Sequence, residues 1–335
     1  MSRIEFIHLG MMKTATTYMQ QVWNTDPAYA LSYRGNVAFV EQLREEVRLK
    51  RTQGYVQSEI NTDSPYVEGQ KIVVSNEGFS TAFLNEPEYQ TRIPDFIEFA
   101  SRNLGRLSDA TSNILLVVRE PLSWIRSIYN QSIKQGWSGN IQQFIDQQTQ
   151  FLIHSFDVEY LVRSYSRYFD NILILPYEIM KNDESLFWEI ISHTFDIDKP
   201  KVTVEKSQGV MNESIGTDRL YLLSKLHGMS ELFINFLQNA DEIMMQNEKQ
   251  TLIDHQVNYG KWVHRIFVEF AEQEKIDALI QWLDLTGPDE EFFEFRLPAA
   301  LIQAIENKYI KYLQNNIVRE YPDYYAEMLE KFTQS

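Results

Sequence analysis

The stretch of sequence that decides the fold is IEFIHLGMMKTATTYMQQVW, at residues 4–23. Its first six residues are mostly apolar, as in a buried strand, and Gly10 ends that strand. The residues from Thr16 to Trp23 have the composition of a helix that follows directly. A strand, a short loop and a helix in this order are typical of an α/β protein.

The same order recurs along the next 180 residues. Apolar runs predict further strands, and amphipathic patterns predict helices between them. The expected strands are 71–75, 113–119 and 171–175, and the expected helices are 93–107, 122–135, about 141–153, 157–169 and 184–195. We therefore predict an α/β fold of three layers, with a central, mainly parallel sheet whose ligands lie at the carboxyl ends of the strands.

Beyond about residue 200 the strand signals stop. Residues 217–335 are acidic, rich in aromatics and typical of several helices. No linker rich in Pro, Gly or Ser separates them from the rest, so we expect a core at 1–210 and a helical C-terminal extension at 211–335 that packs on it without being an independent domain.

The composition limits the partners. The formal net charge is −16, from 47 acidic and 31 basic residues, and this charge would repel nucleic acid and anionic membranes. There is no cysteine, which rules out disulfides and thiolate metal sites. The apolar runs are too short to span a membrane, and the first ten residues are not those of a secretory signal, so we expect a cytoplasmic protein.

The loop after the first strand carries the strongest functional signal. Backbone amides and a helix N-terminus converge there on a space where an anion can bind, and Lys13 adds a positive charge. Alternatively, Thr14, Thr16 and Thr17 simply cap the helix. Three threonines and a lysine directly behind a buried strand favour a phosphate cradle over a cap.

The loop is not a Walker loop. A kinase or nucleotide hydrolase would have a glycine immediately before the lysine, and Met12 stands there. The third predicted strand ends in Arg119, where a Walker B motif would offer an aspartate to magnesium. The sequence therefore predicts a phosphate site without magnesium machinery.

These residues resemble the sulfotransferases that use 3′-phosphoadenosine 5′-phosphosulfate (PAPS), in particular carbohydrate sulfotransferases of bacterial type. The 5′-phosphosulfate loop of the family is similar to KTATT at residues 13–17, and its 3′-phosphate motif, an arginine followed eight positions later by a serine, is similar to REPLSWIRS at 119–127. ILILPYE at 172–178 is a looser match. The resemblance covers about residues 4–200.

The resemblance implies a P-loop-like fold and PAPS as co-substrate, which leaves as adenosine 3′,5′-bisphosphate, with no metal required. The sulfuryl group would pass in line to a hydroxyl of a carbohydrate or other small alcohol. Lys13 would stabilise the departing phosphate oxygen, residues 14–17 (Thr14, Ala15, Thr16 and Thr17) would orient the 5′-phosphate, and Arg119 and Ser127 would hold the 3′-phosphate.

One departure from the family pattern and the identity of the general base stay open. Ala15 replaces a glycine of the family, and we expect a helical conformation there to tolerate its methyl group. The general base is either Glu77, which follows the second predicted strand, or His8, whose place inside a strand favours a structural role. A divergent P-loop kinase and a non-catalytic nucleotide- or glycan-binding protein are the alternative functions, and the oligomeric state is open.

Overall fold

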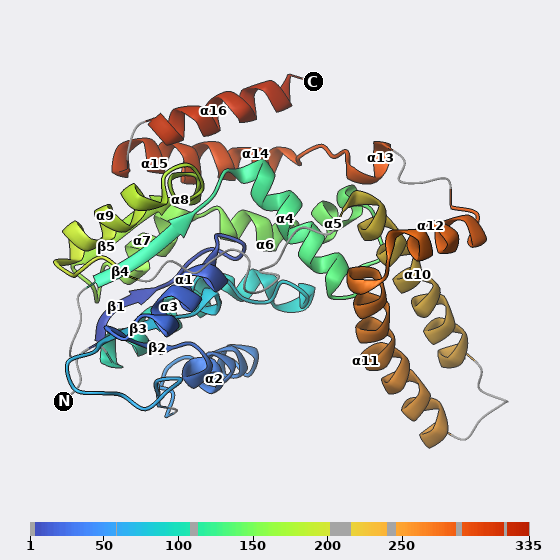
Figure 1. The fold of residues 1–335 in the computed structure, drawn as a ribbon, viewed down its shortest axis with the longest axis horizontal. Coiled ribbons are helices and arrows are strands. Elements are labelled where there is room, and N and C mark those ends of the chain that lie inside the picture. The colour runs from blue at the N-terminus through green and yellow to red at the C-terminus, as the bar shows by residue number, and fades with distance from the viewer. Residues whose placement is uncertain are drawn as a thin grey trace. The chain divides into compact units, whose positions relative to one another are not determined.

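The described strands form one parallel sheet (Figure 1). The computed structural model describes residues 4–57, 59–107, 113–201, 216–239, 246–285, 290–317 and 320–334. Five strands pair in the order β2-β3-β1-β4-β5, and every pairing is parallel. They are β1 (Ile4–His8), β2 (Tyr29–Ser32), β3 (Lys71–Ser75), β4 (Asn113–Val118) and β5 (Asn171–Pro176).

Strand β4 shows why the sheet is covered on both faces. Successive side chains of a strand point to opposite faces, and all residues from Ile114 to Val118 are fully buried. Leu115 and Val117 belong to the core cluster on one face, so Leu116 and Val118 lie in the other. A continuous apolar run is typical of a parallel strand with both faces covered, and the predicted three-layer α/β fold is confirmed.

Aromatic side chains build the core on the first face. The Trp23 ring of α1 (Thr16–Thr25) lies 5.5 Å from Phe6 of β1 and 6.0 Å from Trp188 of α9 (Glu184–Phe195). Through these rings, α1 and α9 both pack against the central strand β1, although they are far apart in the sequence. The start of α1, and with it the Lys13 loop, is thereby fixed on the sheet.

The strand order places three loops at one edge. Strand β1 is central, β3 lies on one side of it and β4 on the other. The order of the strands in the sheet therefore changes direction at β1, with earlier strands on one side of it and later strands on the other. Ligands of parallel sheets bind outside the carboxyl ends of the strands at such a point. The loops after β1, β3 and β4 carry Lys13, Glu77 and Arg119 respectively.

Two compact units divide the chain. The first contains Met1–Trp124, Gln148–Met211 and Pro298–Ser335, and the second contains Ile125–Gln147 and Asn212–Leu297. Residues 298–335 thus group with the sheet, although the sequence suggested one extension from 211 onward. The expected boundary at 210 lies outside the described residues.

The first unit holds the sheet and most of the helices. Besides α1 and α9 these are η1 (Arg34–Asn36), α2 (Val37–Arg48), η2 (Glu77–Phe79), η3 (Pro87–Arg92), α3 (Ile93–Leu107), α6 (Thr149–Ser155), α7 (Val158–Tyr165), α8 (Tyr177–Asn182), α14 (Ala299–Ala304), the π-helical η4 (Ile305–Ile310), α15 (Lys311–Asn316) and α16 (Glu320–Thr333). Helix α4 (Pro121–Lys134) begins in this unit and continues in the second.

The second unit is helical in its described part. It holds α5 (Ile141–Gln147), α10 (Thr217–Asn239), α11 (Gln246–Phe270), α12 (Gln273–Trp282) and α13 (Glu290–Phe293). The Phe292 ring packs 5.0 Å from Tyr221 and 6.1 Å from Tyr129. Of the helices described in either unit, none combines the length and the apolar character needed to cross a membrane.

Candidate functional site

The loop between β1 and α1 has an unusual backbone. Lys13 and Ala15 both adopt left-handed conformations, with φ of 64° and 60°. Such turns point successive N–H groups toward one side and form concave anion sites. The expectation of a helical Ala15 is wrong: the family's glycine position does require positive φ here, and alanine bears the strain that glycine would avoid.

Side chains hold the carbonyl groups in the first part of this loop. Four successive carbonyl oxygens accept hydrogen bonds from side chains at distances of 2.6–2.8 Å. The donors are Ser80 Oγ to Gly10, Thr14 Oγ1 to Met11, Trp124 Nε1 to Met12 and Arg119 Nη1 to Lys13. The Met11 amide donates to the Val117 carbonyl at 3.0 Å and the Lys13 amide to the Glu77 carboxylate. The start of α1 is therefore the part of the loop where an anion can bind.

The threonines do not cap helix α1. Its N-cap residue is Ala15, and no side chain of the described residues makes a capping bond there. Thr14 uses its hydroxyl on the Met11 carbonyl instead, Thr16 is buried, and Thr17 is exposed. A helix N-terminus without a side-chain cap keeps its amides for a ligand, so the structure favours the cradle over the cap.

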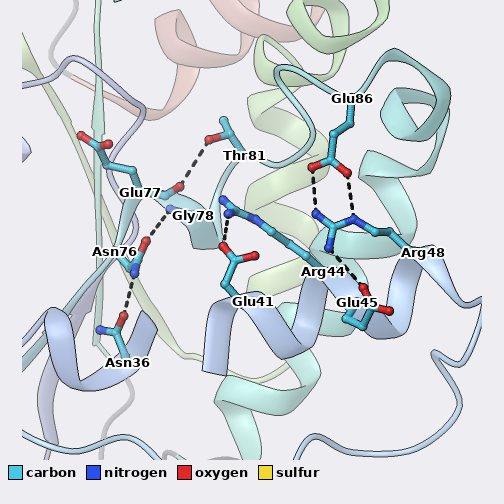
Figure 2. A network of polar contacts seen from close by, with 10 residues as sticks. All are labelled: Asn36, Glu41, Arg44, Glu45, Arg48, Asn76, Glu77, Gly78, Thr81 and Glu86. Atoms are coloured by element: carbon cyan, nitrogen blue, oxygen red, sulfur yellow. Dashed lines mark hydrogen bonds and ion pairs between the residues drawn. The ribbon is translucent and has the colours of Figure 1, made fainter. Parts of the chain in front are cut away.

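Glu77 lies beside this loop. Asn76 holds the turn that presents it: its Oδ1 accepts from the Gly78 amide at 2.8 Å, and its Nδ2 donates to Asn36 Oδ1 at 2.6 Å (Figure 2). In Figure 2 the Glu77 carboxylate points away from the ion pair of Arg44 and Glu41.

Burial raises the pKa of the Glu77 carboxyl, while the hydroxyl of Thr16 and the charge and backbone amide of Lys13 partly oppose that rise. The structure therefore brings Glu77, Lys13 and Thr16 together. A carboxyl group whose pKa is raised toward neutrality is suited to accept a proton from a substrate hydroxyl.

His8 lies in the core at the end of β1. It is fully buried, and its Nδ1 lies 2.9 Å from Ser75 Oγ, which in turn accepts from Gln20 Nε2 at 3.0 Å. Burial lowers the pKa of the imidazole to about 3, so the ring is neutral at physiological pH. A Cβ on Gly10 would lie 2.7 Å from His8 Nε2, which explains the glycine. These contacts favour a structural role for His8.

Arg119 joins the strand β4 to the loop. Its Nη1 binds the Lys13 carbonyl at 2.8 Å, its Nε binds Ser123 Oγ at 3.1 Å, and its guanidinium lies 5.0 Å from the centre of the Tyr177 ring. The two motifs found in the sequence therefore meet at Lys13 and Arg119. Ser127 lies further along α4, in the portion that belongs to the second unit.

Sequence reasoning missed three residues of the site: Ser80, Trp124 and Tyr309. Tyr309 accepts a hydrogen bond from the Arg119 amide at 3.0 Å and donates one to the Arg119 carbonyl at 2.5 Å. Trp124 was within reach, because it belongs to the segment REPLSWIRS quoted for Arg119 and Ser127, and Ser80 follows Glu77 by three residues. Tyr309 had no local signal, since it lies 190 residues after its partner.

No cluster of three or more His, Asp or Glu side chains with metal-site geometry occurs in the part of the chain that the structure describes.

Comparison with known proteins shows a remote likeness in structure. No family model and no curated protein matches the chain. Among solved structures, a sulfotransferase from Alicyclobacillus acidocaldarius is similar over 76% of this chain and 97% of its own, with 12% identity and a TM-score of 0.39. A likeness of this degree decides nothing about activity.

Proposed function

We propose that the protein is a PAPS-dependent sulfotransferase. The observation that carries the proposal is the loop at residues 10–17, whose carbonyls are held inward by four side chains while α1 begins without a side-chain cap. This is an anion site of backbone donors built into a protein whose net charge is −16. The resemblance of KTATT and of the Arg119–Ser127 spacing to the sulfotransferase motifs supports PAPS as the anion.

Each residue has a role in this proposal. Lys13 and the donors of residues 14–17 hold the 5′-phosphosulfate, and Arg119 and Ser127 recognise the 3′-phosphate, as the resemblance implies. The acceptor oxygen attacks sulfur as the bond between sulfur and the bridging phosphate oxygen breaks, so adenosine 3′,5′-bisphosphate leaves. Lys13 stabilises the negative charge that develops on that leaving oxygen.

Glu77 is the general base that we propose. The acceptor hydroxyl loses its proton as the new bond to sulfur forms, and Glu77, beside Lys13 and Thr16, takes that proton. Burial lowers the pKa of His8 to about 3, which makes its imidazole a weak base, and its Nδ1 is paired with Ser75, so Glu77 fits the role better. An acceptor of the carbohydrate or small-alcohol class and a cytoplasmic location complete the proposal, and both rest on the sequence.

The test is sulfuryl transfer from labelled PAPS in the presence of EDTA. The acceptors are a panel of neutral mono- and oligosaccharides, and release of adenosine 3′,5′-bisphosphate is measured. We expect Lys13→Ala and Glu77→Gln to lose at least a hundredfold in rate while remaining folded, on the order of the contribution of a general base or a charge-stabilising donor. Lys181→Ala and Glu189→Gln, at exposed positions, are the matched controls.

Two results would count against the proposal. Absence of transfer or hydrolysis of PAPS by the wild type under every condition would remove the activity. An unchanged rate in the Lys13 and Glu77 variants would remove these residues from the mechanism.

A further inference from the structure

The C-terminal segment from 298 to 334 reaches the nucleotide loop through one tyrosine. Tyr309 is fully buried on η4, between α14 and α15. Its hydroxyl accepts from the Arg119 amide at 3.0 Å and donates to the Arg119 carbonyl at 2.5 Å, and it lies 3.9 Å from Met11 Sδ. A single side chain thus holds both polar groups of the residue at which β4 ends.

The neighbouring peptide is held from the same segment. The Glu120 amide donates to Glu178 Oε1 at 3.0 Å. The other carboxylate oxygen of Glu178 accepts a hydrogen bond from Tyr325 on α16. Two C-terminal tyrosines therefore fix two successive peptides, one directly and the other through Glu178.

The backbone around Tyr309 has an uncommon form. Residues 305–310 are π-helical within an otherwise α-helical run from 299 to 316. Short π-helical turns of this kind occur frequently at functional sites. The aromatic surroundings fix the ring further, since Phe156 lies 5.2 Å from it in an edge contact and Tyr325 lies 6.5 Å from it in a stacked one.

Arg119 transmits this order to the loop. Its backbone is held by Tyr309, and its guanidinium holds the Lys13 carbonyl at 2.8 Å. Arg119 is one of the four donors to the loop carbonyls, beside Ser80, Thr14 and Trp124.

We propose that Tyr309 is a positioning residue of the nucleotide site, which sets Arg119 and through it the Lys13 loop, so that the C-terminal segment is part of the binding machinery. The inference rests on the proposed function, because the nucleotide is taken from it. It assigns a function to a segment that carries no recognisable motif. Tyr309 acts through Arg119 and does not itself touch the ligand.

A double-mutant cycle tests this route of action. Calorimetry with adenosine 3′,5′-bisphosphate gives the dissociation constants of the wild type, Tyr309→Phe, Arg119→Lys and the double variant. Tyr309→Phe loses two hydrogen bonds to the Arg119 backbone, and we expect it to weaken binding about tenfold. Arg119→Lys loses the charged hydrogen bonds to Ser123 and the Lys13 carbonyl, and we expect it to weaken binding about a hundredfold. The double variant should bind within twofold of Arg119→Lys.

Tyr29→Phe is the matched control. Tyr29 is also buried, and its hydroxyl also binds a backbone carbonyl, that of Asp198, at 2.7 Å. It begins β2, whereas the site lies at the carboxyl ends of the strands. Its variant should bind the nucleotide within twofold of the wild type, at a comparable cost in thermal stability.

Additive effects of the two substitutions would overturn the inference, because Tyr309 would then act independently of Arg119. An effect of Tyr309→Phe no larger than that of Tyr29→Phe would overturn it as well. Failure of the wild type itself to bind adenosine 3′,5′-bisphosphate is a different result, and it would count against the proposed function.

Discussion

Replacement of Ala15 by glycine tests the strained conformation of the loop through the sign and size of a stability change. The left-handed conformation costs an L-residue about 1–2 kcal/mol, and glycine avoids this cost. Against this gain, glycine adds roughly 0.5–1 kcal/mol of chain entropy to the unfolded state. Loss of a partly buried methyl group lowers the free energy of unfolding by at most about 0.8 kcal/mol. These opposing contributions nearly cancel, so we expect the free energy of unfolding to change by less than about 0.5 kcal/mol.

Two reference variants calibrate the measurement. Lys50 is exposed and also left-handed, with φ of 58°. Lys50→Gly relieves the same backbone strain without the loss of a buried methyl group, so its free energy of unfolding should rise by about 0.5–1 kcal/mol. Ala326 is partly buried inside the helix α16. Ala326→Gly relieves no backbone strain, so its free energy of unfolding should fall by about 1–1.8 kcal/mol.

Urea unfolding followed by tryptophan fluorescence measures all three variants against the wild type. If Ala15→Gly destabilises the protein as much as Ala326→Gly does, Ala15 is not left-handed. The description of the loop as a concave anion site would then be refuted with it.

Three further predictions concern the same site. Burial raises the pKa of Glu77, so the folded state holds this proton more tightly than the unfolded chain. The wild type should therefore lose stability relative to Glu77→Gln as the pH rises above 4.5. Parallel profiles of stability against pH for the two proteins, measured by urea unfolding between about pH 4 and 8, would contradict this. The pKa of His8 is lowered from 6.5 to about 3, so the unfolded chain takes up the proton first, and stability should fall by up to about 1.4 kcal/mol per unit as pH drops below 6.5. His8→Gln should flatten that acid limb of the profile, and an unchanged slope would show that the imidazole is not buried. Trp124→Phe leaves the Met12 carbonyl without its donor and should weaken nucleotide binding by about tenfold, whereas Trp188→Phe, which loses an indole bond to Glu184, should leave binding unchanged.

The sequence predicted most of the strands and one of the long helices with good accuracy. Lys71–Ser75 and Ile93–Leu107 have the predicted bounds, and β4 ends one residue earlier than expected. Long apolar runs and a regular helical period define such elements locally. Strand β2 was missed because four residues, YALS, carry no recognisable alternation. The helix expected at about 141–153 is divided into α5 and α6, and the helix expected at 157–169 is α7, which ends at Tyr165.

The candidate site was predictable where the signal was local. Lys13, Glu77 and Arg119 each follow a recognisable strand, and the order of a parallel sheet brings such positions to one edge. The conformation of Ala15 was not predictable, because alanine is the strongest helix former and only its tertiary surroundings impose positive φ. Tyr309 depends on contacts across 190 residues, which no local pattern specifies.

Binding of adenosine 3′,5′-bisphosphate to the wild type, measured by calorimetry in EDTA, tests the central claim most directly. Adenosine 5′-monophosphate and ATP with magnesium serve as the comparison ligands, and Lys13→Ala as the loop variant. We expect the bisphosphate to bind without metal at least tenfold more tightly than either comparison ligand, and to lose most of its affinity in Lys13→Ala. No binding of the bisphosphate, or binding only of ATP with magnesium, would contradict the account.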